Sequence, residues 1–210
     1  MSFSIISKSL GNFETNCVAV ANSESKQLVL FDAPINVAEF LKEFAGYTLV
    51  ALLLTHGHFD HTLGVSTLKP LQIFGHEGDK KLYSRPQVMS AWMTPEEVSA
   101  LQSVPVTNWV KSGDKLNLAG LQIEVRHAPG HSPGSVVYYI PALSSAVTGD
   151  CIFQGSIGRT DLPGGSMDEL MKSLNEQILT LPEDTKLYSG HGPITTVGEE
   201  KRSNSFLQAS

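Results

Sequence analysis

Thr55-His56-Gly57-His58-Phe59-Asp60-His61 is the densest run of candidate metal ligands in this chain, with four ligand-type side chains in six residues. It directly follows a continuous apolar run at 48–54, which is typical of a strand buried on both faces. Residues two apart in an extended segment project to the same side, so His56 and His58 can hold one ion. Gly57 relieves crowding where the backbone turns toward the last two ligands. This run therefore predicts a metal site at the end of a buried strand.

Three later segments each place one candidate ligand beside glycines, after an expected strand. They are Pro129-Gly130-His131-Ser132-Pro133-Gly134, Thr148-Gly149-Asp150 and Ser189-Gly190-His191-Gly192-Pro193. The glycines let the backbone turn tightly and expose the side chain. Each segment alone is weak evidence, because a histidine beside Gly and Pro is more often a turn residue. Together with the first run, they complete the ligand set of a site for two metals.

Strands and helices are expected in both halves of the chain. Short runs rich in Val, Ile and Phe predict strands at 3–7, 16–21, 27–31, 48–54, 72–74, 115–118, 121–127, 136–140, 146–148 and 186–189. Apolar spacing and a capping box at Ser166-Met167-Asp168-Glu169 predict helices at 35–44, 63–69, about 166–180 and 196–203. We therefore expect a layered α/β (α+β) fold, with residues 1–210 forming a single domain.

The stretch from 77 to 105 is polar and irregular, with Met89, Trp92 and Met93 among charged and turn residues. It is a candidate for a flexible lid over the site. An ordinary helical insertion explains the same pattern, and both interpretations stay open at this point.

Composition narrows the class of protein. The net charge of −6 argues against a nucleic-acid partner, because phosphates favour a basic face. No apolar run approaches the roughly 18 residues of a membrane span, and no secretory signal is visible, so we expect a cytoplasmic protein. In that compartment Cys17 and Cys151 are expected to be two reduced, buried thiols, with a single disulfide as the alternative.

On these motifs the chain resembles the metallo-β-lactamase fold superfamily, and within it the short bacterial type of glyoxalase II (hydroxyacylglutathione hydrolase). The resemblance covers nearly the whole chain. Its motifs are Thr15-Asn16-Cys17, Phe31-Asp32, the run from His56, 129–131, 148–150, Gly158-Arg159-Thr160-Asp161-Leu162-Pro163-Gly164-Gly165, 190–193 and the tail 198–207, in which Ser205 stands where a proline is usual. It implies an αββα sandwich of the metallo-β-lactamase type, with the ligands on loops at one edge.

The resemblance also implies a role for each ligand. A first metal is expected on His56, His58 and His131, and a second on Asp60, His61 and His191, with Asp150 bridging the two. Asp60 is the expected catalytic residue, because it would also orient the attacking hydroxide. The cofactor is expected to be two divalent ions, zinc in the first place. Since every ligand is N or O, iron or manganese also fits.

Such a site predicts hydrolysis without a serine or cysteine nucleophile. Two ions about 3.5–4 Å apart can hold a bridging hydroxide that is nucleophilic at neutral pH. The same ions polarise a carbonyl and stabilise the developing oxyanion. The expected substrate is a small-molecule thioester such as S-lactoylglutathione, and we expect a monomer or small homo-oligomer.

Recognition of glutathione is less well supported by the sequence. Arg159 is the candidate substrate-binding residue, and the alternative is that it forms a salt bridge with Asp161, which stands where the family has an aromatic. Longer glyoxalase II enzymes bind glutathione with a C-terminal helical extension. The chain ends at Ser210, soon after His191, so we do not expect that extension. Another ester or thioester substrate therefore stays open.

Other activities share parts of this pattern. Persulfide dioxygenases of the same fold use one iron on two histidines and an aspartate and share the Gly-Arg-Thr-Asp segment, but the continuation 162–165 favours the hydrolase. A β-lactamase is disfavoured because the motifs lack the cysteine-bearing pattern, and a nuclease is disfavoured by the acidic charge. His127 is expected beside the site without metal contact, His76 to be structural or exposed, and Cys151 to point away.

Overall fold

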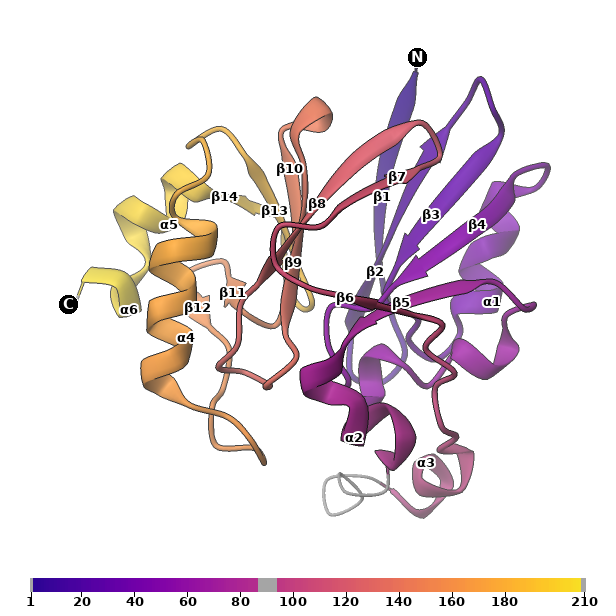
Figure 1. The fold of residues 1–210 in the computed structure, drawn as a ribbon, viewed down its shortest axis with the longest axis horizontal. Helices are drawn as coiled ribbons and strands as arrows, with labels where there is room; N and C mark the ends of the chain where they lie inside the picture. The colour runs from indigo at the N-terminus through magenta and orange to yellow at the C-terminus, as the bar shows by residue number, and fades with distance from the viewer. Residues whose placement is uncertain (1, 87–93, 209–210) are drawn as a thin grey trace.

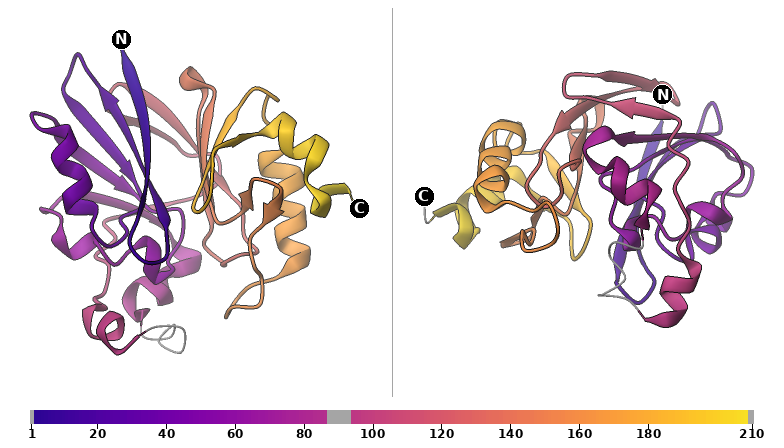
Figure 2. Two further views of the ribbon diagram at one scale, coloured as in Figure 1. Left: turned by 180° about the vertical axis from the view of Figure 1, so that it is seen from behind. Right: turned by 60° about the horizontal axis from the view of Figure 1, so that its bottom comes forward.

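Two six-stranded β-sheets face each other in the computed structural model, which describes residues 2–86 and 94–208. Figure 1 shows the sheets side by side, with α1 outside one sheet and α4 and α5 outside the other. The view from behind in Figure 2 has the same layers. The arrangement is the αββα sandwich that the resemblance implies.

The first sheet is built by the N-terminal half of the chain. Its order is β1 (Phe3–Leu10), β2 (Thr15–Asn22), β3 (Gln27–Phe31), β4 (Thr48–Leu53), β5 (Gln72–His76) and β6 (Asn108–Val110). The first three strands are antiparallel, whereas β3, β4, β5 and β6 run parallel. The parallel strands end at the same edge, and the segment that carries His56 leaves β4 there.

The second sheet is built by the C-terminal half. Its order is β14 (Thr195–Thr196), β13 (Lys186–Ser189), β10 (Ser145–Gly149), β9 (Val136–Ile140), β8 (Leu121–His127) and β7 (Lys115–Leu118). Strands β10 and β13 are parallel, so the loops after both begin at the same edge. The short strands β11 (Ile152–Phe153) and β12 (Ser156–Ile157) form a separate hairpin after β10.

The described helices are short. They are α1 (Val37–Phe40), which continues as the 3-10 helix η1 (Leu41–Phe44), η2 (Phe59–His61), η3 (Val65–Thr67), η4 (Glu77–Asp79), α2 (Lys80–Ser84), α3 (Pro95–Ala100), η6 (Pro141–Leu143), α4 (Met167–Ser173), which continues as the π-helix η7 (Leu174–Ile178), α5 (Val197–Ser203) and α6 (Ser205–Gln208). Among the described residues, no helix has the length and apolar character needed to cross a membrane.

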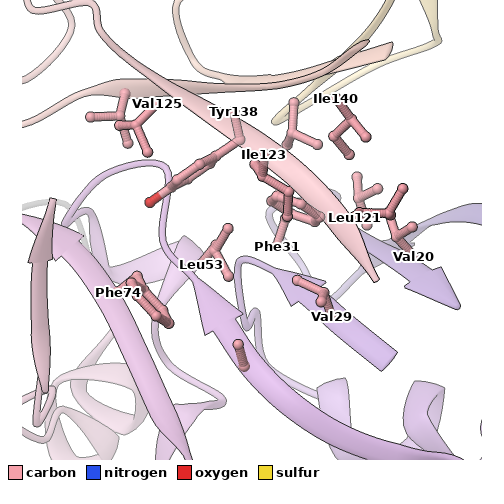
Figure 3. Packing of buried hydrophobic residues seen from close by; sticks show 14 of the residues in the cluster. Val20, Val29, Phe31, Leu53, Phe74, Leu121, Ile123, Val125, Tyr138 and Ile140 are labelled. Atoms are coloured by element: carbon pink, nitrogen blue, oxygen red, sulfur yellow. The ribbon is translucent and has the colours of Figure 1, made fainter. Parts of the chain in front are cut away.

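Alternation along β4 shows how the layers are held together. Ala51 and Leu53 belong to the cluster between the two sheets, and Leu52 and Leu54 to the cluster under α1. Figure 3 shows the inter-sheet layer, in which Leu53 of the first sheet lies opposite Tyr138 of the second. The Tyr138 hydroxyl donates to the carbonyl oxygen of Leu54 at 3.0 Å, so the last residue before the metal-ligand run is tied to the opposite sheet.

The expected helix at 63–69 is wrong, because only a 3-10 turn forms there at Val65–Thr67. Gly64 lies so close to the preceding loop that a Cβ would be 2.2 Å from the Pro34 carbonyl oxygen. After the turn, Leu68 is extended, and Pro70 disfavours helix for the residue before it. Strands β6, β11, β12 and β14 were not predicted, since two or three residues are too few to show a pattern.

Two further expectations concern the segment 77–105 and the cysteines. Within the first, η4 and α2 precede 87–93 and α3 follows it, but Met89, Trp92 and Met93 lie outside the described residues, so the lid stays a prediction. Cys17 and Cys151 are both free and buried, as expected. Burial raises the pKa of both thiols.

Candidate metal centre

Four segments from the two sheets bring the seven expected ligands together. One follows β4, one joins β8 to β9, and the other two follow β10 and β13. Their ligand-type atoms form three overlapping groups in which all atoms lie within 4.8 Å of one another. The groups are His56, His58 and His131; His56, His61 and Asp150; and Asp60, His61 and His191. Every expected ligand belongs to at least one group.

The distances between these atoms match ligands that share an ion. Two ligands at 2.0–2.1 Å from a tetrahedral zinc lie about 3.3 Å apart. In this structure His56 Nε2 lies 3.1 Å from His58 Nδ1. Asp60 Oδ2 lies 3.4 Å from His61 Nε2 and 3.3 Å from His191 Nε2. The side chains are therefore already at the separations that shared coordination requires.

Asp150 connects the two groups of three. Its Oδ2 lies 3.5 Å from Nε2 of His131 and also 3.5 Å from Nε2 of His191, while its Oδ1 lies 3.3 Å from Nε2 of His61. The side chain is only 11% exposed. This position between both groups is the one that a bridging carboxylate needs.

Neighbouring acceptors set the orientation of the imidazoles. His61 Nδ1 lies 2.7 Å from Asp32 Oδ2, and His131 Nδ1 lies 2.8 Å from the Arg159 carbonyl oxygen. A hydrogen bond from Nδ1 leaves the lone pair on Nε2, which is the usual arrangement in metal-binding histidines. Asp32 also accepts from the backbone and hydroxyl of Thr55, each at 2.8 Å, so it holds the start of the ligand run.

Several buried polar atoms in the cluster have no hydrogen-bond partner. They are Nε2 of His58, His61 and His131, and Oδ1 of Asp150. A buried polar atom without a partner costs about 1–3 kcal/mol, so several in one place indicate a missing ligand. In His61 and His131 this atom is Nε2, which carries the lone pair when Nδ1 donates its hydrogen bond. The residues present thus fit divalent cations.

Burial and neighbouring charges shift the pKa values in the cluster in both directions. Burial, together with the nearby His131, lowers the pKa of His58 to about 3, which keeps its lone pair free at neutral pH. Burial opposes ionisation of Asp150, but His61 and His191 outweigh it and hold the pKa of this carboxyl well below its usual range. Burial likewise opposes a charge on His191, yet hydrogen bonds to Asp150 and Asp60 raise its pKa to about 10.

Two residues beside the N-terminal hairpin support the ligands from outside. Thr15 Oγ1 donates to Asp60 Oδ2 at 3.0 Å. Asn16 Nδ2 donates to the carbonyl oxygens of Ser189 at 2.9 Å and Gly192 at 2.8 Å, on either side of His191. Sequence reasoning quoted both residues only as part of the resemblance. The motif at the start of β2 was thus the available signal, but the sequence assigned no role to its residues.

The remaining candidates lie where the sequence predicted. His76 and His127 stack with ring centroids 3.9 Å apart, and neither belongs to the described ligand groups. His127 Nε2 lies 2.9 Å from the Pro133 carbonyl oxygen, beside the His131 loop. Cys151 is buried in the cluster under α4, with its thiol directed at the Ala128 carbonyl oxygen, and it is absent from those groups as well.

A cavity of about 290 Å³ opens beside the cluster. Besides ligands it is lined by Phe13, Phe59, Arg159 and Leu162. The rings of Phe13 and Phe59 meet edge to face at 4.9 Å, so one wall is apolar. Arg159 donates two hydrogen bonds of 2.7 Å to Asp161, which is the salt bridge considered above.

Comparison with known proteins agrees with this geometry. The chain is 38% identical to a probable metallo-hydrolase, YqgX, of Bacillus subtilis over 81% of each chain. It is 36% identical to the hydroxyacylglutathione hydrolase GloC of Haemophilus influenzae over 94% of each.

Solved structures similar to this one agree with the sequence comparisons. The BLEG-1 B3 metallo-beta-lactamase has a TM-score of 0.87 and 32% identity, with coverage of 97% of this chain and 99% of that one. TTHA1623 in a di-iron-bound form has a TM-score of 0.84 and 36% identity, with coverage of 96% and 100%. The model of the metallo-beta-lactamase superfamily matches residues 10–191, a span that holds all seven clustered side chains, and the chain belongs to that superfamily.

Proposed function

We propose that this protein is a hydrolase with two divalent metals that cleaves small thioesters of the glyoxalase II type. The observation that carries the proposal is the set of seven converging side chains with partnerless buried lone pairs. The similarity to a hydroxyacylglutathione hydrolase over 94% of the chain supports the thioester substrate. Zinc is the proposed metal, and the di-iron form of a 36% identical protein makes iron the first alternative.

Each side chain has a proposed task. His56, His58 and His131 would hold one cation, and Asp60, His61 and His191 the other, with Asp150 between them. When bound, the cations supply an activated water nucleophile and polarise the carbonyl that is attacked. Asp60, held by the Thr15 hydroxyl at 3.0 Å, accepts a hydrogen bond from the attacking water and so fixes its direction.

The cavity supports a small substrate with an apolar part. Phe13, Phe59 and Leu162 offer a wall against which an acyl or thiol chain can pack. Arg159 is the basic residue at this cavity, but its side chain is already paired with Asp161. A carboxylate of glutathione would therefore compete with Asp161, and we propose that Arg159 contributes to binding without making glutathione obligatory.

The test is a panel of thioesters with protein of known metal content. Protein loaded with zinc, iron or manganese is given S-lactoylglutathione and simple acyl thioesters, and free thiol release is followed. Since Cys17 and Cys151 are buried, the protein itself should add little thiol signal. We expect release that needs metal and stops with a chelator. Two bound metals without cleavage of any thioester would contradict the proposal, and one iron with oxygen uptake on glutathione persulfide would favour the dioxygenase.

Hydrolysis of β-lactams is a second candidate, favoured by the 32% identity to BLEG-1. The same seven side chains could serve it, because a strained amide and a thioester both need an activated water and a stabilised oxyanion. A chromogenic cephalosporin is added to the same panel. Turnover above that of every thioester would replace the first proposal by this one.

The last proposals concern the domain organisation, location and partners of the whole protein. We propose a single domain over residues 1–210, acting in the cytoplasm as a monomer or small homo-oligomer on a small-molecule substrate, with no nucleic-acid or membrane partner.

A further inference from the structure

Asp79 is a buried carboxylate that no motif in the sequence pointed to. It ends the 3-10 helix η4 just after β5, and its residue is 1% exposed. Its Oδ2 accepts from the Gly57 backbone N–H and from the Ser132 hydroxyl, each at 2.7 Å. Its Oδ1 accepts from the Gly134 backbone N–H, also at 2.7 Å. All three donors are neutral, so the hydrogen bonds to this buried carboxylate involve no charged partner.

The three donors come from the two segments that carry the first group of ligands. Gly57 stands between His56 and His58, and Ser132 follows His131. A single carboxylate thereby links the run after β4, in the first sheet, to the loop between β8 and β9, in the second. Bonds of 2.7 Å to an ionised acceptor are short and strongly directional. They hold the two segments at one separation.

The backbone around Asp79 is packed too closely for residues larger than glycine at two positions. A Cβ on Gly134 would lie 2.5 Å from the Asp79 nitrogen and 2.6 Å from its Cγ. A Cβ on Gly78 would lie 2.5 Å from the Pro133 carbonyl oxygen. Glycines thus stand where η4 presses against the 132–134 segment, and this close approach lets the carboxylate reach both ligand segments.

The second group of ligands is held by other residues. His61 is oriented by Asp32, Asp60 by Thr15, and the His191 loop by Asn16. Among the described residues, the Asp79 carboxylate makes no hydrogen bond to any of these segments. We propose that Asp79 is the positioning residue of the first metal site, which holds Gly57 and Ser132–Gly134 at the distance where His56, His58 and His131 close on one cation. It acts on metal affinity and does not touch the substrate.

The test compares Asp79→Asn with Glu200→Gln. An asparagine keeps the size of the side chain but replaces one acceptor oxygen by an NH₂ group that opposes the donors. Glu200 is a matched control, since it is 0% exposed and accepts from the Thr195 hydroxyl at 2.6 Å, the Gly155 N–H at 2.9 Å and Asn204 Nδ2 at 2.8 Å, away from the ligand groups. Zinc binding is measured by calorimetry with chelator competition, and thermal stability without metal is measured alongside.

Asp79 can have this role only if the cluster binds metal, so the wild-type protein is titrated first. If it binds none of zinc, iron and manganese, the proposed function fails. If it binds zinc, Asp79→Asn should weaken one of the two sites by about 10–100-fold, as changes behind metal ligands commonly do, and leave the other unchanged. Glu200→Gln should lower thermal stability without changing either affinity. Unchanged affinity of both sites in Asp79→Asn, or equal weakening of both sites in that variant, would overturn the inference. An equal loss of affinity in Glu200→Gln would overturn it as well.

Two further variants identify the affected site and guard against misfolding. If Asp79 serves only the first site, then adding Asp79→Asn to His131→Ala, which already lacks a ligand of that site, should leave the affinity of the second site unchanged. Should Asp79→Asn fail to fold, Ser132→Ala removes one donor and leaves the carboxylate in place. We expect it to weaken the same site to a smaller extent, and unchanged affinities there would overturn the inference as well.

Discussion

His191 and His58 belong to the same cluster, yet their surroundings push their charges in opposite directions. Burial opposes a charge on His191, but Asp150 and Asp60 raise its pKa to about 10. At His58, burial and the neighbouring His131 lower the pKa to about 3. At neutral pH, therefore, His58 offers a lone pair at once, whereas His191 holds a proton that a metal has to displace.

The first prediction is that the two metal sites differ in their dependence on pH. A histidine whose pKa is raised to about 10 is protonated below that pH, so affinity at the second site should rise with pH. The pKa values of His56 and His58 are lowered, so these two ligands of the first site should release no proton when zinc binds between about pH 6 and pH 8. Calorimetric zinc titration in buffers of different ionisation enthalpy measures the protons released at each step. Equal release at both steps would contradict the assignment.

A second prediction separates Asp60, the proposed catalytic residue, from a histidine outside the cluster. Asp60→Ala should reduce thioester hydrolysis by about 100-fold or more, since it removes the group that we propose orients the attacking water. It should also weaken the second metal more than the first, because Asp60 belongs to the group with His61 and His191. His76→Ala is the control. Its ring stacks on His127, and turnover should stay within a few-fold. Complete loss in His76→Ala would show that the ligand set is wrong.

At this scale the sequence predicted the side chains that converge in the cluster but missed most of the residues that hold them. His56, His131 and His191 could be found because they stand in unusual local patterns beside glycines. Asp79 has no such pattern. Its partners Gly57 and Ser132 reach it only after β4, β5 and β8 have been brought together. Such roles depend on long-range contacts that a linear pattern does not contain.

At the scale of elements, local signals were reliable where they were long or chemically specific. The apolar run at 48–54 became β4 (Thr48–Leu53), whose last three residues are buried on both faces of the sheet. The capping box became the start of α4, where the Ser166 hydroxyl accepts from the Glu169 N–H. The helix was expected to continue regularly, but it becomes π-helical at Leu174–Ile178 while keeping Leu174 and Ile178 buried against the second sheet. Packing decided that detail.

The third prediction concerns the start of α4. The Ser166 hydroxyl caps the helix at 3.3 Å, and its backbone N–H donates to the Gly130 carbonyl oxygen at 2.8 Å, next to His131. Ser166→Ala removes only the cap and should lower the free energy of unfolding by about 1 kcal/mol. Urea denaturation measures the change. Ser166→Asp retains an acceptor and should remain near wild type, whereas equal loss in both variants would mean that the hydroxyl has another role.

At the scale of the whole molecule, the metal centre lies across the junction of the two sheets. The ligands at 56–61 follow β4 of the first sheet, and Asp150 and His191 follow β10 and β13 of the second. The class of fold could be expected from the resemblance, but the order of the strands and the contact of Leu53 with the opposite sheet could not. These depend on pairing between distant segments. Bound cations would thus add a connection between the sheets beside their shared apolar layer.

The fourth prediction follows from that connection. Metal that binds the folded chain should stabilise it by about 2.7 kcal/mol when its free concentration is 100 times the Kd. Removal of metal by a chelator should therefore lower the Tm, and a His56→Ala/His191→Ala variant, which lacks a ligand from each group, should respond much less. Hydrogen exchange locates the effect. Because the ligands follow strands in both sheets, protection should fall at the ends of both β4 and β13 when metal is removed. A loss confined to one sheet would mean that the cations do not bridge the two halves, even if the protein binds them.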